Sequence, residues 1–204
     1  MPRFREIARR VWLGAISNRA HQLVLVVSAL IFSWLAMQAV HEAGHVLHAW
    51  ASGGTVTRVL LDPLEISRTN VSPNPHPQFV AWGGPIWGAV LPACAWFGLR
   101  AASFPRAWLA RFFAGFCLVA NGAYLLGGSL YPVGDADVLL REGAPRWTLA
   151  ACGIVAAAAG LWLWNGIGVH FGLTRGAPAI DKRAAWGTAL AAAIVAAAEW
   201  LSVE

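Results

Sequence analysis

Apolar residues fill most of the chain in five long runs, which short polar gaps separate. The runs lie near residues 22–51, 79–99, 108–131, 147–170 and 184–203. A helix needs about 20 apolar residues to cross the hydrocarbon core of a bilayer, and each run is long enough to do so. The pattern therefore predicts an all-α polytopic membrane protein with about five transmembrane helices.

The gap between the first two runs has the residue pattern of a short β-hairpin. Residues 55–61 are β-prone, Asp62 and Pro63 form a turn signal, and residues 65–71 alternate in part between polar and apolar side chains. A hairpin at membrane depth must be covered by protein or by a water-filled cavity, because lipid cannot satisfy its edges. We therefore expect a hairpin that packs against the helices.

The same pattern divides the chain into three parts. Residues 1–21 form a basic N-terminal segment, residues 22–142 a three-helix core, and residues 143–204 contain two additional transmembrane helices. The N-terminal segment carries five arginines, and it is either a helix on the membrane surface or a plain basic tail. Its arginines are Arg3, Arg5, Arg9, Arg10 and Arg19.

Composition excludes several classes of protein. The chain is 58% hydrophobic and 12% charged, with a net charge of +5. So few charges argue against a soluble enzyme, a disordered tail or a nucleic-acid-binding protein, and the expected surroundings are a lipid bilayer. Most of the basic residues lie in the N-terminal segment and in the second and fourth gaps, which predicts a cytoplasmic N-terminus and an outer C-terminus. The oligomeric state stays open.

The first apolar run contains the segment His41-Glu42-Ala43-Gly44-His45. Residues four apart on a helix differ by about 40° in direction and about 6 Å in height, so His41 and His45 can offer two imidazole nitrogens to one metal ion. Glu42 lies beside them and can accept a proton from a metal-bound water. Zinc lowers the pKa of such a water to about 7, which makes hydroxide available at neutral pH.

A catalytic zinc site usually has a third protein ligand. Asp135 and Asp137 are the candidates, since they follow the third run, although either could instead cap a helix N-terminus. Among the other histidines, His48 is expected to pack beside the site or line its cavity, and His76 and His170 to lie at solvated or interfacial positions.

These motifs together resemble the site-2 protease family of intramembrane zinc metallopeptidases. The resemblance covers roughly residues 30–142. The features that carry it are the segment at 41–45, the β-prone loop after it, Gly83-Gly84-Pro85 at the next span, and Pro132-Val133-Gly134-Asp135.

The resemblance implies a membrane protein as substrate and Zn²⁺ as cofactor. His41 and His45 would be two metal ligands, Asp135 the third, and Glu42 the general base. It also implies an active site nearer the cytoplasmic face, whereas the basic residues place the histidines toward the outer end of the first span.

The chain departs from the family pattern at several positions. Ala136 follows Asp135, where the family usually has glycine, so the choice between Asp135 and Asp137 stays open. Gly88 stands where the family often has asparagine. Asn121 in the third span is the candidate for a substrate-binding amide, at a different spacing from the aspartate.

The sequence therefore predicts an intramembrane zinc metalloendopeptidase, in a membrane of the bacterial cytoplasmic type. The alternative is a non-catalytic membrane protein that binds metal or helices, such as an inactive relative of these proteases or a transporter component. Both would share the pair of histidines, but only the protease needs Glu42 as a base.

Overall fold

The computed structural model describes residues 2–202, with side chains from residue 14 onward. Five of its helices are long and apolar enough to cross a membrane, and a two-stranded antiparallel hairpin follows the first of them. The predicted fold class is therefore confirmed, and the chain has the architecture of a multi-pass integral membrane protein. Its elements are α1 (Pro2–Ala51), β1 (Val56–Leu60), β2 (Arg68–Val71), α2 (Pro77–Ala101), α3 (Ala107–Leu130), α4 (Gly134–Arg141), α5 (Arg146–Trp164), a 3₁₀ turn (Ile167–Val169) and α6 (Lys182–Ser202).

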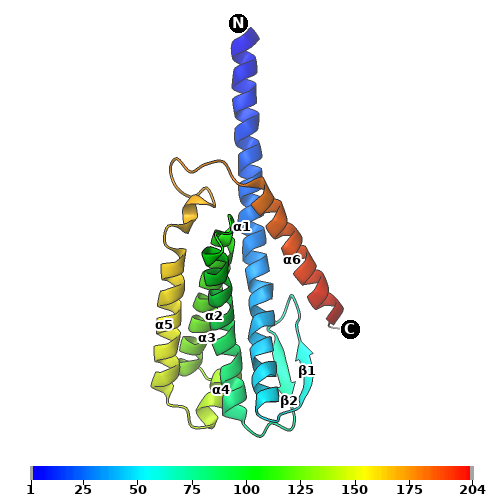
Figure 1. Cartoon of the computed structure of the whole chain (residues 1–204), viewed down its shortest axis with the longest axis vertical. Coiled ribbons are helices and arrows are strands. Elements are labelled where there is room, and N and C mark those ends of the chain that lie inside the picture. Colours follow the sequence, from blue (N-terminus) through cyan, green and yellow to red (C-terminus); the bar gives the residue numbers. More distant parts are fainter. Residues whose placement is uncertain (1, 203–204) are drawn as a thin grey trace.

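Two boundaries differ from those expected. The helix α1 is continuous from Pro2, so residues 2–21 belong to the same helix as the first run instead of forming a separate tail, and Figure 1 shows these turns extending beyond the other helices. The side chains of residues 1–13 lie outside those described. The fourth long helix ends at Trp164 and not near residue 170, because Gly166 adopts a left-handed conformation with φ of 76°.

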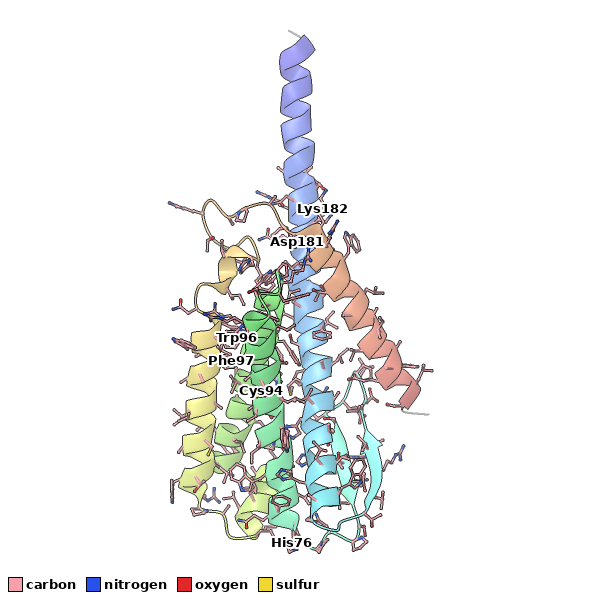
Figure 2. The ribbon with its side chains drawn as sticks, in the orientation of Figure 1. His76, Cys94, Trp96, Phe97, Asp181 and Lys182 are labelled. Carbon is pink, nitrogen blue, oxygen red and sulfur yellow. The ribbon has the colours of Figure 1, made fainter. Side chains whose placement is uncertain are left out.

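The helix α1 lies at the centre of the molecule. Figure 1 shows α2, α3 and α5 on one side of it and α6 with the hairpin on the other. Asp181 and Lys182, which Figure 2 labels, mark the start of α6 beside α1. The helices α3 and α5 approach closely at glycines, where a Cβ on Gly122 or Gly153 would meet the other helix's backbone.

The closest approach near the histidines is between α1 and α2. A Cβ on Gly44 would collide with the carbonyl of Gly83, and a Cβ on Gly83 would collide with the carbonyl of Gly44. These two glycines therefore allow the backbones to touch, which brings the first turns of α2 against His45 and His48.

The hairpin runs back along the C-terminal part of α1 (Figure 1). Its strands pair Val56 with Val71 and Leu60 with Arg68, with a bulge near Arg58. The hydroxyl of Ser202 at the end of α6 donates a hydrogen bond of 3.2 Å to the carbonyl of Leu61, at the turn of the hairpin. The hairpin is thus covered by protein on the side that faces α1, as its backbone groups require.

Candidate metal centre

Two imidazoles and one carboxylate converge between α1 and α4. The rings of His41 and His45 lie one helical turn apart, with centroids 4.8 Å from each other. The Nε2 atom of His41 is 2.9 Å from one carboxylate oxygen of Asp135, and the Nε2 atom of His45 is 3.3 Å from the other. Three groups of the types that bind divalent metals therefore face a common point. Asp135 lies 94 residues after His41 in the sequence.

The loop between α3 and α4 places Asp135. Gly134 has a φ of +53°, a conformation that favours glycine, and a Cβ there would collide with the Tyr124 hydroxyl. The backbone N–H of Asp135 donates a hydrogen bond of 2.9 Å to that hydroxyl. The ring of Tyr124 also meets the ring of His41 edge to face, with centroids 5.9 Å apart. Tyr124 therefore fixes both the aspartate backbone and one histidine.

The charge state of Asp135 suits a cation ligand. Burial raises the pKa of its carboxyl, but the hydrogen bonds with His41 and His45 outweigh that effect and lower the pKa to about 2. Asp135 is consequently a carboxylate at neutral pH, which is the form that binds metal ions.

Asp137 points elsewhere. Its carboxylate pairs with Arg141 one turn later on α4, at 2.8 Å. The N-cap residue of α4 is Val133, and both aspartates lie in the first turn. The structure thus brings Asp135, and not Asp137, to the histidines.

The second nitrogen of each imidazole is held by a hydrogen-bond acceptor. The Nδ1 of His41 lies 2.8 Å from the Oδ1 of Asn121, and the Nδ1 of His45 lies 2.8 Å from the carbonyl of Val80. Acceptors of this kind behind Nδ1 are typical of metal-binding histidines, in which Nε2 coordinates the ion. Asn121 in turn donates a hydrogen bond of 2.9 Å to the carbonyl of Cys117.

Asn121 is only 2% exposed, and both ends of its amide have partners within the protein. A Cβ on Gly88 would lie 2.8 Å from its Nδ2 atom, so the absence of a side chain at residue 88 leaves room for this amide. The structure therefore places Asn121 behind His41. The predicted contact with substrate stays a prediction.

Gly84 provides the space in front of the imidazoles. A Cβ at this position would collide with the Nε2 atoms of both His41 and His45. The residue lies inside α2, where glycine is otherwise unfavourable by about 0.5–1 kcal/mol relative to alanine. The glycine consequently keeps both Nε2 atoms clear.

Glu42 lies between the histidines and the hairpin. It is 3% exposed, and one ligand atom from each of His41, Glu42 and His45 falls within 4.8 Å of the others, so this group could hold a metal ion. Its two carboxylate oxygens accept hydrogen bonds from Ser67 at 2.7 Å and Thr69 at 2.6 Å. Glu42 is therefore close to the imidazoles but tied to β2.

A groove of about 400 Å³ opens beside Glu42, between α1 and β1. Among the described residues that line it, Glu42 is the one ionisable group. The other lining residues are apolar, namely Ala39, Ala43, Val46, Leu47, Trp50, Val59 and Leu61. Part of the lining is exposed, including Leu47 and Trp50, so the groove is open toward the surroundings of the helix bundle.

The remaining histidines lie outside the cluster. His48 stacks on Phe79 with ring centroids 4.1 Å apart and hydrogen-bonds to its carbonyl, so it packs beside the site. His76 is exposed at the end of the bundle where α2 begins (Figure 2). His170 is exposed and stacks on Trp108.

Three site residues were missed by the sequence analysis. Tyr124 carries no motif, and Ser67 and Thr69 are ordinary polar residues just before and within β2. Ser67 immediately precedes β2 and Thr69 lies within it, so their spacing of two in an extended segment is a signal that could have been used once the hairpin was assumed to cover the first span.

Comparisons of the chain with protein-family models, curated proteins and solved structures find no match.

The geometry predicts different effects for the two aspartates. Asp135→Ala removes the carboxylate that faces both Nε2 atoms, and we expect it to lower zinc affinity by more than about a hundred-fold. Loss of a residue that only hydrogen-bonds to a metal ligand lowers metal affinity by less than this. Asp137→Ala removes only an exposed ion pair and should leave the affinity nearly unchanged. Competition with a chromophoric chelator measures both values. The reverse ranking would assign the ligand role to Asp137.

Proposed function

We propose that this protein is an intramembrane zinc metallopeptidase that hydrolyses peptide bonds of membrane-embedded protein substrates. The observation that carries the proposal is the convergence of the His41 and His45 Nε2 atoms with the Asp135 carboxylate, where the two histidines and Glu42 belong to a membrane-spanning helix. Ionisable residues in such a helix are costly, so a cluster of them marks a functional site.

The donor set fits zinc. Two imidazole nitrogens and one carboxylate oxygen are ligands that zinc prefers, and three protein ligands are typical of sites that leave a position for water. The acceptors behind His41 and His45 match the outer partners of metal-binding histidines. Other divalent ions also bind such a set, and zinc is proposed because it suits both the ligands and hydrolysis.

Zinc bound here would polarise the carbonyl of the substrate's peptide bond and would lower the pKa of a bound water. The chain itself supplies a proton acceptor beside the metal ligands, the carboxylate of Glu42. Glu42 accepts the proton of the attacking water on a carboxylate oxygen and then donates it to the amine of the leaving peptide. Asp135 and the two histidines would hold the ion, and Asn121 and Val80 keep the imidazoles oriented.

The groove between α1 and β1 supports an apolar peptide as the substrate. Its walls are apolar and its ionisable group is Glu42, so a lipid-embedded segment that enters it is brought beside the proposed base. A helix has its backbone hydrogen bonds satisfied internally, and a bond that is to be cut must first unwind. The protein is expected to act in a membrane of the bacterial cytoplasmic type.

The experiment that tests the proposal removes the metal. The purified protein is reconstituted in vesicles with a labelled single-span substrate, and we expect a zinc chelator to stop cleavage and added Zn²⁺ to restore it. The product is detected on a gel. A non-catalytic membrane protein would bind zinc under the same conditions but release no product, and that result would contradict the proposed activity.

A further inference from the structure

The residues at the start of β2 and just before it make a specific contact with α1 at Glu42. The hydroxyls of Ser67 and Thr69 donate one hydrogen bond to each carboxylate oxygen, at 2.7 and 2.6 Å. The backbone N–H of Ser67 also donates a hydrogen bond of 2.8 Å to the side chain of Gln38, one turn before Glu42. Gln38 and Glu42 are both buried, so this edge of the hairpin is fixed to α1 by three hydrogen bonds.

Glu42 has a second role available to it. Its carboxylate lies close enough to the imidazoles for His41, Glu42 and His45 to hold one metal ion. A glutamate is a good zinc ligand, so two carboxylates would compete to be the third ligand, and the Asp135 oxygens lie 2.9 and 3.3 Å from the Nε2 atoms. A glutamate that coordinates the ion is no longer free to accept a proton from water.

The hydroxyls of Ser67 and Thr69 favour the role of Glu42 as a base over its role as a metal ligand. Because they engage both oxygens, the carboxylate cannot rotate toward the imidazoles without breaking at least one hydrogen bond to a charged acceptor. Each oxygen still has a second lone pair, so the carboxylate can accept a proton while it stays in place.

We propose that Ser67 and Thr69 are positioning residues, which hold Glu42 off the metal and reserve it as the base while Asp135 completes the ligand set. The inference rests on the metal site of the proposed function. The hairpin would then orient the general base, in addition to packing against the helix bundle.

The test uses cobalt in place of zinc, because the visible spectrum of Co²⁺ changes when a ligand is added. The variant Ser67→Ala with Thr69→Ala is expected to bind one equivalent of cobalt per chain, as the wild type does, but with a spectrum of higher coordination number. Adding Glu42→Gln to that variant should restore the wild-type spectrum, since the extra ligand would be lost. The rate of substrate cleavage should fall by roughly 10–100-fold, as for other outer partners.

Two control variants separate this role from a general effect on the hairpin. Thr57→Ala removes a hydroxyl of β1 that bonds to the Asn70 carbonyl and does not touch Glu42, so it should leave the spectrum unchanged. Exchanging the two residues, Ser67→Thr with Thr69→Ser, keeps both hydroxyls and should also preserve it. These comparisons need cobalt binding only, so they remain decisive even where no substrate is cleaved.

Two outcomes would overturn the inference. One is a wild-type spectrum in the double alanine variant, and the other is an altered spectrum that persists after Glu42→Gln is added. A wild-type protein that takes up no cobalt would overturn the positioning role and the metal site together.

Discussion

Gly84→Ala is expected to abolish metal binding. The new methyl group would occupy the space directly in front of the Nε2 atoms of His41 and His45, and both rings would have to turn away. Because the Nδ1 atoms are held by Asn121 and Val80, turning the rings also breaks those hydrogen bonds. We expect the zinc content of the purified variant, measured by atomic emission, to fall from one equivalent to near zero.

The matched control for this variant is Gly98→Ala, in the same helix. A Cβ at Gly98 meets nothing within 4 Å, so the change should leave the metal content intact and stabilise α2 slightly, by about 0.5–1 kcal/mol. A Gly84→Ala protein that is folded and keeps its zinc would contradict the location of the site between α1 and α4, in front of Gly84.

Glu42→Gln is expected to stop cleavage while the metal remains bound. Glutamine has the size of glutamate and can keep hydrogen bonds with Ser67 and Thr69, but it cannot accept a proton at neutral pH. The loss of a general base typically costs about 10²–10⁴-fold in rate. The initial rate of product formation in vesicles, with zinc content measured on the same sample, gives both quantities.

Glu142→Gln provides the control, since Glu142 is exposed at the end of α4. Its rate and zinc content should equal those of the wild type. Cleavage that persists in Glu42→Gln would remove the base from the mechanism and favour a non-catalytic metal-binding protein or another proton acceptor.

Local patterns predicted the elements of this fold well. The five spans follow from the length of the apolar runs, and the hairpin follows from a β-prone segment beside a turn signal. The boundaries that were wrong depended on single residues. The helix α5 ends early at the left-handed Gly166, and α1 begins earlier because nothing breaks the helix near residue 21.

The site was predictable only in part, for a physical reason. His41, Glu42 and His45 share one helix, so their spacing fixes their relation. The choice of Asp135 over Asp137 depends on the path of the loop between α3 and α4, through the φ of Gly134 and the Tyr124 hydroxyl. The contacts of Glu42 depend on how the hairpin folds back. Such tertiary contacts have no signature in a local pattern.

The role of Asn121 illustrates the same limit. The structure places this amide behind His41, in space left by Gly88, and its contact with substrate stays a prediction. Packing between α2 and α3 decides where the amide points, and no spacing rule along one helix encodes it.

The most direct test of the account is the metal content of the purified wild type beside His45→Ala. His48→Ala serves as the control, because its ring lies on the same helix but stacks on Phe79 outside the cluster. We predict about one equivalent of zinc in the wild type and in His48→Ala, and almost none in His45→Ala, as expected when one of three protein ligands is removed. A wild type without a divalent metal, or a His45→Ala protein that retains one, would contradict the account.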